Sequence, residues 1–316
     1  MLAYIVAILI GFVVLVWAAD RFTDGASELA RIFGVSQLVV GLTVVAIGSS
    51  APEIMVSFNA ALVGAMNLAV GNAIGSNITN VALVLGVTAL VVPIAFDRTV
   101  IQGSVGILLA AMAATGVMLM DGQLDFIDGV LLIAALVAYS LWLIKTARSD
   151  VGDATESKEP RDMKRALMWV GIGGLLLPLS ARVLVWGASG VARDLGVSEL
   201  IIGLTIVALG TSLPELAASV AGALKGEHEM VVGNIIGSNV FNLMAVLGVP
   251  GLIAPGALAP DVLSRDLPVM VAVVILLIFL MFLGRKNQQL GRISGFVLLC
   301  SYLAYLIEVI RQTQAG

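Results

Sequence analysis

The segment Gly48-Ser49-Ser50-Ala51-Pro52-Glu53 occurs a second time as Gly210-Thr211-Ser212-Leu213-Pro214-Glu215. Each copy is followed by the same second motif, Gly71-Asn72-Ala73-Ile74-Gly75-Ser76-Asn77 with Asn80, and Gly233-Asn234-Ile235-Ile236-Gly237-Ser238-Asn239 with Asn242. The offset is 162 residues throughout, and residues 36–86 and 198–248 are identical at 26 of 51 positions without a gap. Roughly three matches would arise by chance, so the chain contains an internal duplication.

The composition around these motifs is that of a membrane protein. Apolar residues make up 59% of the chain and charged residues 12%, against about 45–50% and 25% in soluble domains. Several apolar runs exceed the roughly 20 residues that span a bilayer, whereas the short alternating segments of a membrane β-barrel are missing. No basic patch with interleaved aromatic residues points to nucleic acid. The single Cys300 lies in an apolar run, which excludes disulfides and thiolate metal sites.

The hydropathy pattern predicts an all-α polytopic protein with ten transmembrane helices, at residues 2–19, 37–63, 68–92, 100–120, 126–146, 165–185, 199–224, 230–253, 266–284 and 291–311. A charged linker at 147–164 separates a first five-helix repeat, 1–146, from a second, 165–316. Because each repeat has an odd number of spans, the second copy enters the membrane from the opposite side. The sequence therefore predicts two inverted repeats, an architecture common in secondary transporters.

The basic residues indicate the orientation. Loops after the odd-numbered spans hold 13 of the 17 Lys and Arg residues. The positive-inside rule then places the central linker in the cytoplasm and both termini outside, in a plasma (cell inner) membrane.

Two glutamates stand out within the spans. Glu53 is the only charged residue between Arg31 and Asp97, and Glu215 is the only one between Glu199 and Lys225. An ionisable group deep in a span costs about 3 kcal/mol or more, so we interpret both as functional. The alternative is a capping box, in which Ser50 and Ser212 pair with these glutamates merely to begin a helix.

The same motifs predict broken helices at the membrane midplane. Pro52 and Pro214 lack an N–H and interrupt the helical hydrogen bonds, and such irregular backbone is tolerated only where it lines a cavity. Freed carbonyls, the hydroxyls of the motif and two carboxylates form an all-oxygen set that suits hard cations such as Na⁺ and Ca²⁺.

The second motif belongs to the same predicted site. Asn72, Ser76 and Asn80 are spaced four residues apart and share one helical face, as do the equivalent residues of the second repeat. We expect Ser76, Asn80, Ser238 and Asn242 to coordinate ions, although small and polar residues can also serve helix packing alone.

Together these motifs resemble the two α-repeats of the cation/calcium exchanger superfamily, in its sodium/calcium exchanger branch. The length and short linker look like the bacterial YrbG-type calcium/sodium antiporters. The resemblance implies a cluster of ion sites between the repeats, with spans one and six sliding as the gate. It implies as metal ligands Glu53, Glu215, Ser49, Ser50, Thr211, Ser212, Ser76, Ser238, Asn80 and Asn242, and the backbone carbonyls of Ala46 and Ala208. The potassium-dependent branch uses acidic residues in this region, where this chain has Asn.

The sequence is thus interpreted as a Na⁺/Ca²⁺ antiporter that works by alternating access, without a cofactor and as a monomer in the bilayer. The residues alone support a hard-cation transporter, and Ca²⁺ against Na⁺ is what the resemblance adds. Ca²⁺/H⁺ exchange and a passive cation channel stay open as alternatives. No enzyme activity is expected, because the spans contain neither a zinc-binding His pair nor a Ser-based catalytic arrangement.

Overall fold

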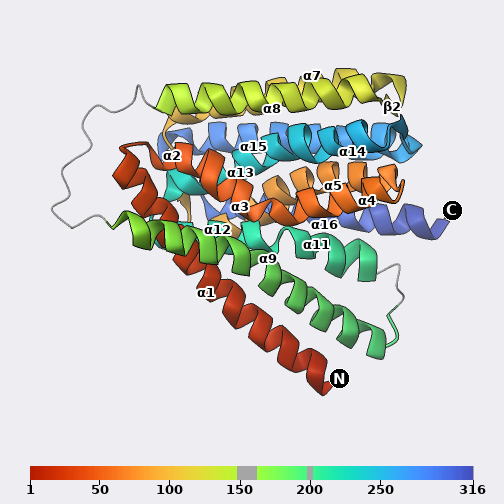
Figure 1. The fold of residues 1–316 in the computed structure, drawn as a ribbon, viewed down its shortest axis with the longest axis horizontal. Coiled ribbons are helices and arrows are strands. Elements are labelled where there is room, and N and C mark those ends of the chain that lie inside the picture. The colour runs from red at the N-terminus through yellow and green to blue at the C-terminus, as the bar shows by residue number, and fades with distance from the viewer. Residues whose placement is uncertain (148–161, 198–201, 316) are drawn as a thin grey trace.

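The computed structural model describes residues 1–147, 162–197 and 202–315, which are mostly helical (Figure 1). The helices are α1 (Leu2–Phe33), α2 (Gln37–Val40), α3 (Ala46–Ser49), α4 (Ala51–Leu62), α5 (Met66–Thr79), α6 (Leu85–Val91), α7 (Arg98–Met118), α8 (Phe126–Ala147), α9 (Met163–Asp194), α11 (Ala208–Thr211), α12 (Leu213–Leu224), α13 (His228–Phe241), α14 (Leu247–Ile253), α15 (Leu267–Leu283) and α16 (Arg292–Ala315). Most of the predicted linker, and the first residues of the predicted seventh span, lie outside the described residues.

Ten membrane spans can be assigned within the described residues. Eight helical segments are long and apolar enough to cross a bilayer, and two bent pairs complete the set. The pair Gln37–Ser49 and Ala51–Leu62 bends by 47°, and the pair Thr205–Thr211 and Leu213–Leu224 bends by 54°. Both breaks fall in the duplicated motif, as predicted. The first and sixth spans are longer than predicted, because α1 and α9 continue through their polar ends.

Two small antiparallel sheets relate the halves of the chain. β1 (Ile94–Ala95) pairs with β4 (Gln289–Leu290), and β2 (Gln123–Leu124) pairs with β3 (Gly256–Ala257). β1 and β3 follow the third and eighth spans, which are equivalent in the two repeats, and β2 and β4 follow the equivalent fourth and ninth spans. Each strand of one sheet therefore has its equivalent in the other sheet. The fold therefore consists of two inverted repeats.

The same pairings show that the bent pairs cross the membrane. Six spans separate β1 from β4 and four separate β2 from β3, provided that Thr205–Leu224 counts as one crossing. Only an even number of crossings returns the chain to the same face. The Met1 amino group lies 3.0 Å from the Asp194 carboxylate, so an even number of spans must also separate these two residues. The number is even only if Gln37–Leu62 counts as one crossing.

The helices α1 and α9 lie side by side at one edge of the bundle, tilted away from the other helices (Figure 1). They pack antiparallel through glycines. A Cβ on Gly11 would lie 2.9 Å from the backbone of Leu184, and a Cβ on Gly173 would lie 2.6 Å from Phe22. Small residues allow this close approach of membrane helices. These two contacts are equivalent under the 162-residue shift, so the duplication includes α1 and α9.

The centre of the bundle is α13, whose residues from Met230 to Phe241 are all buried. Short π-helical segments flank the duplicated motifs at equivalent positions: η1 (Gly41–Val45), η2 (Asn80–Val84), η4 (Gly203–Val207) and η5 (Asn242–Val246). Such segments are rare and often mark functional sites.

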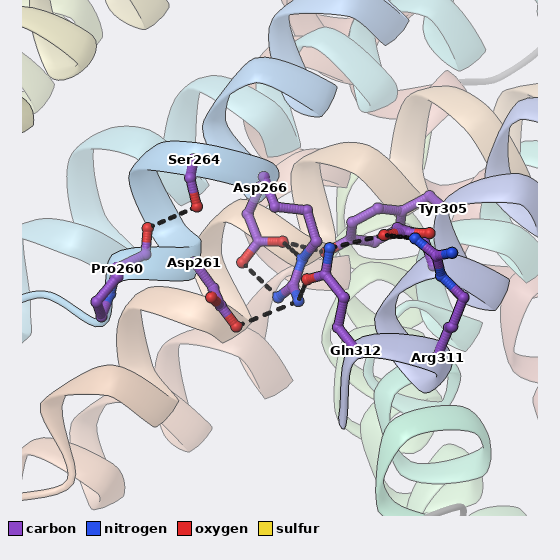
Figure 2. A network of polar contacts seen from close by, with 9 residues as sticks. Pro260, Asp261, Ser264, Asp266, Tyr305, Arg311 and Gln312 are labelled. Atoms are coloured by element: carbon purple, nitrogen blue, oxygen red, sulfur yellow. Dashed lines mark hydrogen bonds and ion pairs between the residues drawn. The ribbon is translucent and has the colours of Figure 1, made fainter. Parts of the chain in front are cut away.

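A polar network joins the beginning of the ninth span to the end of the tenth (Figure 2). Asp266 is buried within a π-helical turn, η6 (Val262–Asp266), and accepts hydrogen bonds from Arg265 at 2.7 Å and from the Tyr305 hydroxyl at 3.0 Å. Arg265 also donates to Asp261 and Gln312. This buried carboxylate is neutralised by its neighbour and holds two helices together.

Candidate ion-binding site

Both broken spans turn at a serine of the duplicated motif. Ser50 separates α3 from α4 with φ −81° and ψ 7°, and Ser212 separates α11 from α12 with φ −89° and ψ 6°. Neither serine side chain caps the helix that follows. The capping-box alternative is therefore wrong, and these hydroxyls are available for other contacts.

The Ser50 hydroxyl reaches across to the other repeat. It donates a hydrogen bond of 2.9 Å to Oε1 of Glu215. Glu53 and Glu215 both have no exposed side-chain surface, and their carboxylates repel each other. In the described part of the chain no Lys or Arg pairs with either, in contrast to Asp266. Two buried negative charges without a protein cation make a strong site for a bound cation.

Two asparagines hold the motifs in place. The Ser49 hydroxyl donates to Oδ1 of Asn234 at 3.1 Å, and Nδ2 of Asn234 donates to the Ser219 hydroxyl at 3.0 Å. In the first repeat, Nδ2 of Asn72 donates to the Ser57 hydroxyl at 3.1 Å and to the Glu53 carbonyl at 3.0 Å. The asparagines therefore position the broken spans.

Ser57 and Ser219 were missed by the sequence reasoning. Both are buried, and they are identical under the 162-residue shift. That identity was the signal that could have found them.

Six of the twelve predicted ligands have buried oxygen atoms without a hydrogen-bond partner in the described part of the chain. Such atoms belong to Glu53, Glu215, Ser212, Ser238, Asn80 and Asn242. An unpaired buried polar atom costs about 1–3 kcal/mol, so native proteins rarely keep several together unless something binds them. The elements that carry them meet across the repeats: α4 contacts η5, and α12 contacts η2. These oxygens are of the type that hard cations prefer.

The two repeats are not in the same environment. Ala46 and Ser49 are fully buried, whereas their equivalents Ala208 and Thr211 are exposed and half-buried. Thr211 donates to the carbonyl of Ala208, at 3.4 Å. The structure thus buries the predicted ligands Ser49, Ser50, Ser76, Ser212 and Ser238. It leaves Thr211 lining an opening, and Ala208 exposed.

Comparison with known proteins places this geometry in a family. Residues 3–145 and 165–311 match the family described as "Sodium/calcium exchanger protein". The inner membrane protein YrbG of Escherichia coli (strain K12) is 41% identical over 308 residues, which cover 95% of this chain and 94% of that protein. The sodium/calcium exchanger MaX1 of Methanosarcina acetivorans is 30% identical, with 95% and 96% covered.

A solved structure shows the same arrangement of the chain. The sodium-calcium exchanger NCX_Mj, soaked with zero Na⁺ and Ca²⁺, superposes with a TM-score of 0.84 at 34% identity. The match covers 98% of this chain and 99% of that one. The resemblance seen in the motifs is confirmed, and the chain belongs to the sodium/calcium exchanger family.

Proposed function

We propose that this protein exchanges Na⁺ for Ca²⁺ and expels Ca²⁺ from the cell by using the inward Na⁺ gradient. The observation that carries the proposal is the pair of buried carboxylates, Glu53 and Glu215, linked across the repeats through Ser50 and without a protein cation. Two carboxylates can neutralise one Ca²⁺ or part of the charge of several Na⁺. The two ions then compete for one place.

The remaining ligands are the neutral oxygens of the motifs. We infer that they comprise the hydroxyls of Ser49, Ser50, Thr211, Ser212, Ser76 and Ser238, the amide oxygens of Asn80 and Asn242, and the carbonyls of Ala46 and Ala208. Ca²⁺ takes six to eight oxygen ligands in flexible geometry. The unpaired buried oxygens support this set, because cation binding would satisfy them.

Exchange requires that the site open to one side at a time. The exposed Ala208 and half-buried Thr211 support a path for ions past α11, from the end of the bundle where Met1 lies. In the other repeat, Ala46 and Ser49 are buried, and their helix α3 packs against α13. With the positive-inside orientation, the face at Met1 is extracytoplasmic, the linker 147–164 is cytoplasmic and both termini lie outside. The repeats 1–146 and 165–316 would exchange roles when access alternates, within a single monomer.

Ca²⁺/H⁺ exchange is the second candidate. The mutual repulsion of two buried carboxylates favours uptake of any positive charge, and a proton would relieve it as a cation does. The hydroxyl-rich surroundings favour Na⁺.

The test is ⁴⁵Ca²⁺ uptake into proteoliposomes loaded with Na⁺, compared with Na⁺-free vesicles at the same pH. We expect uptake to need internal Na⁺ and to fall to background in Glu53→Gln. Glu308→Gln is the matched control, because Glu308 pairs with Arg311 away from the site. Uptake driven by a pH gradient alone would establish Ca²⁺/H⁺ exchange, and flux that needs neither gradient would indicate a channel.

A binding measurement checks the site independently of transport. Ca²⁺ should raise the melting temperature of the purified wild type, because a ligand of the native state stabilises it. The same Ca²⁺ concentration should leave Glu53→Gln unchanged. A full shift in the mutant would refute the assignment of Glu53.

A further inference from the structure

A cavity of about 270 Å³ opens between both broken spans and α9. Pro52 and Thr211, from the two copies of the motif, line it together with Arg182 of α9. Arg182 is therefore a fixed positive charge at the mouth of a site whose proposed substrates are cations.

Arg182 is unusual in two respects. It lies 12 residues before the end of α9 at Asp194, which is about 18 Å along a helix. It forms no ion pair or hydrogen bond in the described part of the chain, whereas Arg21, Arg31, Arg265 and Arg311 all pair with carboxylates. An unpaired ionisable group so far inside a span points to function.

The duplication gives Arg182 a counterpart of opposite charge. The residue 162 positions earlier is Asp20, on the equivalent helix α1. Asp20 forms an ion pair of 2.7 Å with Lys225, whose own equivalent is Val63. At equivalent positions of the two repeats, α1 thus carries a carboxylate neutralised by Lys225, and α9 carries the unpaired guanidinium of Arg182.

We propose that Arg182 is a specificity-determining residue that weakens the binding of a Ca²⁺ ion at the open mouth more than the binding of each Na⁺ ion. The proposal rests on the proposed function, because it assumes that Na⁺ and Ca²⁺ bind between Glu53 and Glu215. Repulsion by one fixed charge is twice as large for a divalent ion as for a monovalent ion. The guanidinium thereby hinders rebinding of released Ca²⁺ from the outer side.

The magnitude follows from Coulomb's law. A charge taken to be about 10 Å from the bound ion changes the affinity for a monovalent ion about threefold and for a divalent ion about tenfold. Replacing Arg182 by Gln should therefore lower the external KM for Ca²⁺ about tenfold and the inhibition constant of external Na⁺ about threefold.

The experiment uses right-side-out membrane vesicles that contain the full-length protein, with ⁴⁵Ca²⁺ supplied from outside. Arg182→Lys keeps the charge and should behave as wild type. Arg193→Gln is the matched control, because it removes the same charge from the end of the same helix and is not among the described residues that line the cavity. Everted vesicles, which present the other face, should show no change in KM.

Ionic strength provides a readout that needs no mutant. Screening by inert salt should lower the external KM for Ca²⁺ of the wild type more than that for Na⁺, and Arg182→Gln should lose this dependence. Four results would each overturn the proposal. They are an equal change of the Ca²⁺ and Na⁺ constants in Arg182→Gln, an unchanged external KM for Ca²⁺ in that mutant, a change of KM seen only in everted vesicles, and a change of KM in Arg182→Lys. Failure of the proposed function looks different, since the wild type itself would then show no Na⁺-dependent uptake.

Discussion

Replacing Gly75 by Ala should trap the site in its present, open arrangement. Its equivalent in the second repeat, Gly237, is tightly packed: a Cβ there would lie 2.8 Å from the Ala46 Cβ and 2.8 Å from the Leu42 carbonyl oxygen. A Cβ on Gly75 would meet nothing within 4 Å. The helices α13 and α3 are therefore in close contact, whereas a gap separates the equivalent helices α5 and α11 at Gly75. The added methyl group fits only where this gap is present.

The magnitude follows from the close contact at Gly237. If the gap at Gly75 closes in the same way, the new methyl meets the equivalents of Ala46 and Leu42, which are Ala208 and Leu204. Overpacking of this kind costs about 1–3 kcal/mol, which is a factor of about 5–150 in the population of the closed state. The gain in helix propensity from Gly to Ala applies equally to both states and cancels.

The assay combines turnover with hydrogen exchange. We expect the maximal Na⁺/Ca²⁺ exchange rate of Gly75→Ala to fall about 5–150-fold, and the amides of α11 to stay unprotected in saturating ligand. Gly237→Ala is the matched control and should shift the population the other way, because its methyl clashes in the present state. Wild-type turnover and normal protection of α11 in Gly75→Ala would refute the reasoning, since α5 would then not be the surface that closes.

Three further changes test other parts of the structure. Asn234→Ala removes the partner of Ser49 and should weaken Ca²⁺ binding about tenfold, measured by equilibrium ⁴⁵Ca²⁺ binding, while the protein stays folded. Asp266→Asn leaves Arg265 without its buried partner and should lower stability by about 3 kcal/mol, measured by thermal unfolding, with the KM for Ca²⁺ unchanged. Lys225→Met removes the cation that pairs with Asp20 and Asp24 of α1 and should raise hydrogen exchange in that part of α1, and an unchanged pattern would show that these ion pairs do not anchor α1.

The fold followed from the sequence because its two strongest signals are independent of tertiary detail. Apolar run length fixes the number of spans, and a gapless repeat with an odd number of spans fixes the inversion. The π-helical segments could not be predicted, because one extra residue in a helical turn has no compositional signature. The extension of α1 beyond residue 19 was also missed, because Asp20 and Asp24 find their partner, Lys225, about 200 positions away in the chain.

For the candidate site, the sequence singled out residues that the structure buries, but it did not predict their hydrogen-bond partners. Duplication singled out Glu53 and Glu215, and the structure buries both. Local spacing can indicate only bonds within each motif, such as the capping box given above as the alternative, whereas the observed bond of Ser50 goes to Glu215 of the other repeat. Contacts of this kind depend on how two distant segments meet, which local spacing does not encode.

The difference between the repeats supports the proposed exchange by alternating access. Ser50 donates to Glu215, but the equivalent pair, Ser212 and Glu53, is not bonded, and both have unpaired buried oxygens. Two nearly identical segments in an inverted arrangement would open the site to both sides or to neither if they adopted the same conformation. One of them must therefore be closed while the other is open, and exchanging their conformations gives the opposite access state at a similar free energy. The duplicated sequence thus predicts that two access states exist, and residues that break the duplication, such as Arg182 and Lys225, are where the two states can differ in energy and ion preference.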